Sequence, residues 1–268
     1  MKITREEYFR AMQKITLLDD IFMSRVFDGE CALTEFVLKI ILNRTLKVKQ
    51  VKTQYGIKNL QGRDIRLDIY AESEDGKKIN IEIQRQDKGA GAKRARYNSS
   101  LIDANTLPEG ETFDALPETY VIFITERDVL KLNEPIYFIE RVIVGKNKFF
   151  NDEAHIVYVN NSIQDDTPLG RLMHDFSCAR PDEMFYKEVA DKVRCHKEEG
   201  KVDSEMDDFM DEIVERIRRE TALEQAVDIA KDMIADGELS IKKIAKLCKL
   251  PLEKVQELAA STPAKDNQ

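Results

Sequence analysis

Asp68 and Glu82 are the two acidic residues whose surroundings most need a chemical explanation. Asp68 stands in RLDIY and Glu82 in NIEIQ, so each carboxylate is flanked by apolar residues inside a run that predicts a strand. They lie 14 positions apart with the turn-forming pair Asp75-Gly76 midway, and pairing about that turn would set them roughly opposite each other. Buried carboxylates are costly and repel each other unless a cation lies between them. The spacing therefore predicts a site for a hard divalent cation.

Gln84 follows Glu82 by two positions, and strand side chains repeat every two residues, so both point to one face. Magnesium binds oxygen ligands in octahedral geometry and keeps several waters. Asp68, Glu82 and the Ile83 carbonyl would hold Mg²⁺, with Mn²⁺ as a substitute, and would leave places for a phosphate and a nucleophilic water. Because Gln84 carries no charge and cannot be a general base, its predicted role is to orient the water or a phosphate oxygen.

The pattern of apolar residues predicts a mixed sheet flanked by helices. Helical spacing of apolar residues gives way to period-two alternation, and later to a continuous apolar run suited to a buried strand. In chain order we expect a helix at 31–45, strands at 48–57, 64–73 and 77–86, a helix at 89–107 and a strand at 118–126. This is an α-β-β-β-α-β order, an α/β (α+β) fold. Residues 136–144 and 155–160 look like two further strands that extend or edge the sheet.

These residues and their order resemble the PD-(D/E)XK nuclease superfamily, which carries an acid on the second core strand and (D/E)-x-K on the third. The sequence is more similar still to its recombination-promoting nucleases, also described as PD-(D/E)XK nuclease family transposases. The resemblance covers about residues 15–200 and is carried by GRDIRLDIYAE, KKINIEIQRQDKGAGAKRARYNSSLID, LPETYVIFITE and TPLGRLMHDFSC. It implies that E-x-Q at Glu82 and Gln84 is a family variant and not by itself a loss of activity. It also implies a first-helix acid near the metal, for which Glu35 is the best match and Glu30 the next.

A basic segment surrounds the acidic pair, although the whole chain has a formal net charge of −8. Between Lys39 and Leu101 there are 15 Lys and Arg against 7 Asp and Glu, a net of +8 that leaves −16 for the rest. Such an island predicts a local nucleic-acid surface, with a solvated face as the simpler alternative. Arginine binds phosphate bidentately. The residues expected to contact the backbone are Arg85, Lys93, Arg94 and Arg96, with Tyr97 stacking on a base, positioning a phosphate or packing in the core.

The chain is expected to divide into a nuclease-like domain at 1–200 and an acidic helical tail at 201–268. Residues 201–236 hold 12 acidic and 5 basic residues, which favours an arm that packs on a partner. A homodimer through the C-terminal helices is the expectation, since cutting both DNA strands is easiest with two centres. The end of the tail resembles a short helix-turn-helix broken at Leu250-Pro251, but Glu253 and Glu257 on its second helix would repel phosphate.

Signals for export and for membrane insertion are not found in the sequence. Its first residues are charged throughout, and no stretch approaches ~20 apolar residues, the length that spans a bilayer. Cys31, Cys178, Cys195 and Cys248 are scattered without a CxxC pair, which predicts reduced, structural thiols. We therefore expect a cytoplasmic protein with no membrane segment.

The leading hypothesis is a Mg²⁺-dependent DNA endonuclease that hydrolyses phosphodiester bonds, with a link to recombination or mobile elements. Its predicted catalytic residues are Asp68, Glu82, Gln84 and Glu35. The alternative from another class is a catalytically silent DNA-binding or assembly protein that keeps the nuclease scaffold. A toxin-like or defence nuclease is a third hypothesis, which the residues do not separate from the first.

Overall fold

The structure is a computed structural model, and it describes all residues except 1–4, 60–61, 86–88, 199–203, 238 and 262–268. The chain separates into two compact units, one of residues 12–200 and one of residues 1–11 together with 201–268. The first helix, α1 (Arg5–Lys14), crosses the sequence boundary between them. None of the described helices combines the length and the apolar character that a membrane crossing requires.

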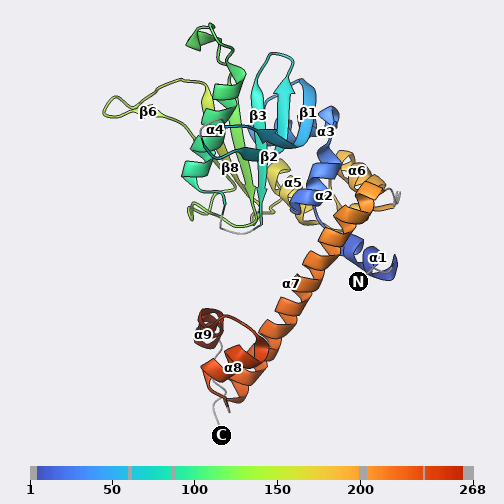
Figure 1. The fold of residues 1–268 in the computed structure, drawn as a ribbon. Helices are drawn as coiled ribbons and strands as arrows, with labels where there is room; N and C mark the ends of the chain where they lie inside the picture. Colours follow the sequence, from blue (N-terminus) through green and yellow to red (C-terminus); the bar gives the residue numbers. More distant parts are fainter. Residues whose placement is uncertain (1–4, 60–61, 86–88, 199–203, 238, 262–268) are drawn as a thin grey trace. The chain divides into compact units, whose positions relative to one another are not determined.

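A six-stranded mixed sheet lies at the centre of the 12–200 unit, in the spatial order β1-β2-β3-β4-β8-β5 (Figure 1). The first three strands form an antiparallel meander, β4 and β8 continue parallel to β3, and β5 is antiparallel to β8 at the edge. The strands are β1 (Val48–Ile57), β2 (Ile65–Ser73), β3 (Lys78–Gln84), β4 (Thr119–Thr125), β5 (Ile136–Ile139) and β8 (Ala154–Asn160). With the helices given below, this arrangement confirms the predicted α-β-β-β-α-β order and mixed α/β class.

The stretch expected as one strand at 136–144 is divided in two. β5 ends at Ile139, and β6 (Val142–Ile143) pairs instead with β7 (Lys148–Phe149) in a separate two-stranded sheet. The reason is the turn that follows, where Gly145 and Asn147 have φ of 78° and 47°. Such left-handed residues let the chain double back on itself, so residues 142–143 pair within their own hairpin and do not lengthen the sheet.

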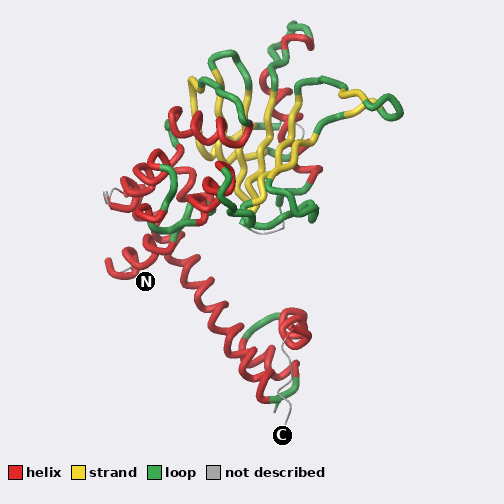
Figure 2. The backbone as a smooth tube through the Cα atoms, turned by 180° about the vertical axis from the view of Figure 1, so that it is seen from behind, coloured by secondary structure: helices red, strands yellow, loops and turns green. Residues whose placement is uncertain are grey.

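Helices pack on both faces of the sheet (Figures 1 and 2). The middle strand β3 is buried over five consecutive residues, Ile79 to Ile83, as a strand covered on two sides must be. On one face, Leu101 and Ile102 of α4 (Ala92–Thr106) share a core with Phe123 of β4. On the other lie α2 (Asp20–Phe27), α3 (Cys31–Leu42) and α5 (Pro168–Ser177), with α6 (Lys187–Glu198) beside them.

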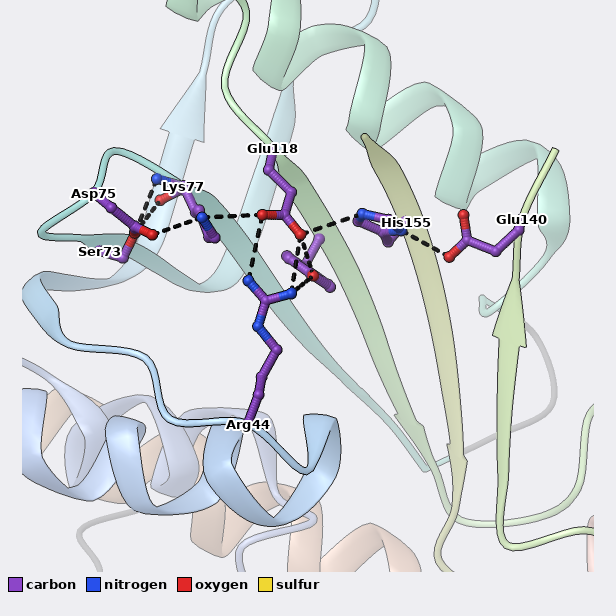
Figure 3. Close-up of polar contacts among 8 residues, drawn as sticks. Arg44, Ser73, Asp75, Lys77, Glu118, Glu140 and His155 are labelled. Atoms are coloured by element: carbon purple, nitrogen blue, oxygen red, sulfur yellow. Dashed lines mark hydrogen bonds and ion pairs between the residues drawn. The ribbon is translucent and has the colours of Figure 1, made fainter. Parts of the chain in front are cut away.

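A cluster of polar side chains lies at the edge of the sheet where the parallel strands β3, β4 and β8 begin (Figure 3). Glu118, directly before β4, accepts hydrogen bonds from Arg44 through both carboxylate oxygens at 3.1 and 3.3 Å. Lys77 Nζ lies 3.0 Å from the same carboxylate, and the Tyr120 hydroxyl also donates to it. His155 Nε2 lies 3.4 Å away. Burial raises the pKa of Glu118, but the hydrogen bonds from Arg44, Tyr120 and Lys77 outweigh it and hold this pKa at about 2. We call this group of residues the Glu118 cluster.

The described part of the other unit is helical in its C-terminal portion, as predicted. It contains α7 (Ser204–Asp236), α8 (Ile241–Cys248) and α9 (Leu252–Ser261). Lys249 ends α8 in the left-handed conformation at φ 55°, and Pro251 directly precedes α9. A small apolar core joins the three helices and consists of Ala230, Ile244, Ala245, Leu250 and Val255.

Candidate active site

Asp68 and Glu82 lie on neighbouring antiparallel strands at the centre of the sheet. The paired register of β2 with β3 runs to Ile69 and Ile81, and the next position along the two strands sets Asp68 opposite Glu82. At that point the Ile83 backbone N–H donates at 2.9 Å to Asp68 Oδ2, so a side-chain carboxylate takes the place of a backbone carbonyl as its acceptor. The hairpin therefore delivers both carboxylates to one place on the face covered by α4.

Glu82 is the most enclosed of the acidic side chains at this site. It has 0% exposure, and its Oε2 accepts from the Arg94 guanidinium of α4 at 2.5 Å. Its other oxygen, Oε1, is buried and has no hydrogen-bond partner within the described residues. Buried polar atoms are nearly always hydrogen-bonded, so an orphaned carboxylate oxygen needs an explanation. A cation or a water that the chain itself does not supply would satisfy it.

Burial and mutual repulsion raise the pKa of both carboxyl groups. Removal from water raises the pKa of Glu82 to about 7, and the negative charge of Asp68 adds to that effect while Arg94 opposes it. Desolvation likewise raises the pKa of Asp68 to about 6, partly offset by its hydrogen bond from Ile83. Two acidic groups whose charged forms are both penalised form a site that favours binding of a positive ion.

Gln84 ends β3 two residues after Glu82, and its amide lies against Gly89. A Cβ placed on Gly89 would meet Gln84 Oε1 at 1.9 Å, so glycine is needed there for the amide to take this position. The same Cβ would lie 3.2 Å from Arg94 Nη1, which itself donates to the Gly89 carbonyl at 3.4 Å. Gln84, Gly89 and Arg94 thus form one wall beside Glu82.

The five residues predicted to contact nucleic acid have different environments. Lys93 and Arg96 are exposed on α4, whereas Arg94 is engaged with Glu82. Arg85 Nη1 lies 3.9 Å from an oxygen of Asp19, and that guanidinium is 42% exposed. Tyr97 takes the core-packing alternative: its hydroxyl donates to the Arg63 carbonyl at 2.6 Å and accepts from Asn59 at 3.0 Å. Tyr97 therefore links α4 to Asn59 and Arg63.

Glu35 does not lie near the acidic pair, and this corrects the expectation for it. Its carboxylate accepts from the Val48 N–H at 2.9 Å and from Lys47 at 3.0 Å, at the start of β1. Val48 pairs with Ser73, at the end of β2 remote from Asp68. The fallback Glu30 is ion-paired with Lys192. The helix position was misjudged because α2, one helix earlier in the chain, is the helix that begins near Asp68.

Asp20, the first residue of α2, is the acidic neighbour that sequence reasoning missed. Its negative charge raises the pKa of Asp68. The preceding Asp19 is 4% exposed and caps the helix by accepting from the Phe22 N–H at 3.4 Å. The pair Asp19-Asp20 before an apolar helix is a capping signal that the sequence does display. Nothing in that signal says that this helix terminus lies against the second strand.

The donors at this site suit a hard divalent ion. Mg²⁺ needs only one or two carboxylates and otherwise keeps waters, and the chain offers Asp68, Glu82 with its orphaned oxygen, and the Ile83 carbonyl. No cluster of three or more His, Cys, Asp or Glu side chains that could hold a metal ion occurs in the part of the chain that the structure describes. The fit is therefore to an ion that takes most of its ligands from water and backbone oxygen.

Comparison with known proteins was informative for one family. Neither the curated proteins nor the solved structures gave a match to this chain. The sequence profile of the PD-(D/E)XK nuclease family transposases matches residues 25–164, which span β1 to β8 with Asp68, Glu82 and α4. This is 140 of the 268 residues, more than half of the chain. The chain therefore belongs to the PD-(D/E)XK nuclease family transposases.

Proposed function

We propose that this protein is a Mg²⁺-dependent DNA endonuclease acting in recombination or mobile-element biology. The observation that carries the proposal is the orphaned, fully buried Oε1 of Glu82 beside the Asp68 carboxylate. Arg94 pairs with only the other oxygen of Glu82, so Oε1 and the Asp68 carboxylate would bind a divalent ion. The family adds that the scaffold is that of a nuclease.

The roles of the residues follow from their positions. Asp68, Glu82 and the Ile83 carbonyl would hold the ion, which when bound lowers the pKa of its water and neutralises phosphate charge. Gln84, held against Gly89, would orient the attacking water or a phosphate oxygen through its amide. Lys93 and Arg96, exposed on α4, would bind the DNA backbone. Burial keeps bulk water away from the Glu82 carboxylate.

A plasmid-nicking assay with Mg²⁺ tests the proposal. Asp68→Asn removes one charged ligand at nearly constant shape, and cleavage should fall about a thousandfold or more. Glu72→Gln is the matched control, because Glu72 lies four residues later on β2 but is neutralised by Lys49 and Lys78 at 2.7 and 2.9 Å. It should cleave nearly as the parent does. Equal cleavage by Asp68→Asn and the parent would remove the proposed mechanism, and a parallel RNA substrate decides the nucleic acid.

A catalytically silent DNA-binding or assembly protein is the second candidate. It is favoured by the ion pair between Arg94 and Glu82, because an acidic site already neutralised by arginine needs no metal. Metal titration separates the two candidates. Stabilisation by Mg²⁺ or Mn²⁺ that is lost in Glu82→Ala supports the enzyme. Salt-sensitive DNA binding that does not change with metal supports the binding protein.

The setting of this activity is also proposed. Four cysteines with free thiols are consistent with a reducing compartment such as the cytoplasm. A homodimer through the C-terminal helices would bring two centres to a duplex. Light scattering of the full chain and of a chain ending before α7 tests that arrangement, which predicts that the shorter chain is a monomer.

A further inference from the structure

Arg94 is the positive charge that occupies the acidic site in this structure. Its Nη2 lies 2.5 Å from Glu82 Oε2, and its Nη1 approaches the Gly89 carbonyl at 3.4 Å. The guanidinium also lies 5.9 Å from the centre of the Phe123 ring, in the range of a cation–π contact. A cation on Glu82 is therefore supplied by α4, while the neighbouring oxygen Oε1 has no partner among the described atoms.

The two members of this ion pair differ in their freedom to move. Glu82 is 0% exposed on a central strand paired on both sides, so its carboxylate is fixed. The Arg94 side chain is 39% exposed at the first turn of α4, and arginine has a long side chain with several rotatable bonds. If a divalent ion bound to Glu82, the Arg94 guanidinium and not the Glu82 carboxylate would be the group that moves.

We propose that Arg94 is a displaceable positioning residue, which neutralises Glu82 in the metal-free protein and is released toward the DNA phosphate when a divalent ion binds. The inference rests on the proposed metal site and adds to it an internal competitor. Gln84 carries no charge and so places no cation beside Glu82, whereas Arg94 brings one to the same wall from α4. The guanidinium expelled by the metal would remain beside the site, where a bidentate donor suits a phosphate.

This exchange links the two ligands of the site. Metal binding must overcome the Arg94–Glu82 interaction, so metal affinity is weaker than the carboxylates alone would give. The released guanidinium then favours the nucleic acid, so DNA affinity rises when metal is present. By linkage the DNA strengthens metal binding by the same factor. The protein would thus avoid holding the metal tightly until a substrate phosphate accepts Arg94.

Isothermal titration of the full chain with Mg²⁺ tests the competition at pH 8.5, above the pKa values of both carboxyl groups. Arg94→Gln should bind Mg²⁺ about tenfold or more tightly than the parent, since a charged hydrogen bond no longer competes. Arg127→Gln is the matched control, because it removes the same charge from an exposed position two residues after β4, and its affinity should stay within about threefold of the parent. If Arg94→Gln does not fold, Arg94→Met keeps the packing on Phe123 and serves the same comparison.

The outcomes separate this inference from the proposed function. Equal Mg²⁺ affinity in Arg94→Gln and the parent overturns the role of Arg94 and leaves the metal site in place. Binding by Arg94→Gln where the parent binds none supports the competition. No binding by any of the three proteins overturns both proposals. Duplex DNA affinity with and without Ca²⁺ gives a second readout: the rise on adding Ca²⁺ should be seen in the parent and Arg127→Gln and lost in Arg94→Gln.

Discussion

Glu82 and Glu118 are two shielded glutamates at opposite ends of the same parallel strands, and their surroundings differ sharply. Glu118 is partly buried, but it accepts from Arg44 and Tyr120 and lies beside Lys77, and these three groups lower its pKa to about 2 (Figure 3). Glu82 receives Arg94 on one oxygen only, as far as the described residues show, and its pKa rises to about 7. Glu118 retains 19% side-chain exposure and Glu82 none, so the better-solvated group is also the better-paired one.

The difference separates a structural carboxylate from a candidate functional one. A glutamate whose charge is fully compensated stabilises the fold and has little capacity left for a ligand. A buried glutamate that is paired through only one oxygen lowers stability and keeps capacity for a ligand. The Glu118 cluster joins the segment that follows α3, the β2–β3 turn and the first residues of β4 and β8, whereas the ion pair of Glu82 joins β3 to α4.

Cleavage is where the two residues should differ most. Glu82→Gln should lower Mg²⁺-dependent cleavage by about a thousandfold or more, because a neutral amide is a poor metal ligand. Glu118→Gln should retain cleavage within about fivefold at a temperature where it is folded. Single-turnover rates on a defined duplex measure both. Similar losses in the two variants would show that the comparison does not distinguish function from structure.

Stability should depend more on Glu118 than on Glu82, the reverse of the order expected for cleavage. Glu118→Gln leaves Arg44 and Lys77 without their shared carboxylate, and the free energy of unfolding should fall by about 2–3 kcal/mol, less than for a fully buried pair. Denaturant unfolding at pH 7.5 without metal measures it. Glu140→Gln, which contacts His155 at the rim of the same cluster, is the control and should lose less than about 1 kcal/mol.

The dependence of stability on pH should have opposite slopes at the two sites. The pKa of Glu82 is raised from 4.5 to about 7, so its burial penalty sets in, and stability falls, as pH rises across that interval. The pKa of Glu118 is lowered from 4.5 to about 2, so its contribution is present above 4.5 and is lost as pH falls toward 2. Each effect is on the order of 3 kcal/mol.

Unfolding curves from pH 3 to pH 8.5 without metal reveal each contribution. Glu82→Gln should flatten the decline between about pH 5 and pH 7 and be more stable than the parent above it, while Glu118→Gln should weaken the loss at acid pH. If stability changes between pH 5 and pH 7 by the same amount in the parent and in Glu82→Gln, ionisation of buried Glu82 does not cause the predicted loss of stability.

The smallest effect is expected at Glu35. Its carboxylate is partly exposed and is bonded to Val48 and Lys47, away from Asp68. Glu35→Gln should therefore lower the free energy of unfolding by less than about 1 kcal/mol and leave cleavage and Mg²⁺ affinity unchanged. A hundredfold loss of cleavage in this variant would restore the role that the family resemblance suggested for the residue.

The local pattern of the sequence predicted the sheet well because period-two alternation is a local property. Strand β1 has the expected bounds, and the turn at Asp75-Gly76 lies where expected, with Gly76 at φ 89°. The hairpin register that brings Asp68 to Glu82 follows from the same turn. The division of residues 136–144 was missed because pairing within a hairpin competes with pairing to the sheet, and strand propensity does not decide between them.

The sequence by itself determined that two carboxylates lie on adjacent strands of one hairpin, with a basic helix after them. Alternation and turn chemistry are read from neighbouring residues, and a family profile records the same pattern. Only the tertiary structure decided that Glu35 lies at the far end, that Asp20 influences Asp68, that Tyr97 packs and that Arg94 reaches Glu82. These outcomes depend on how helices dock onto the sheet, and docking brings together side chains whose distance in sequence carries no signal.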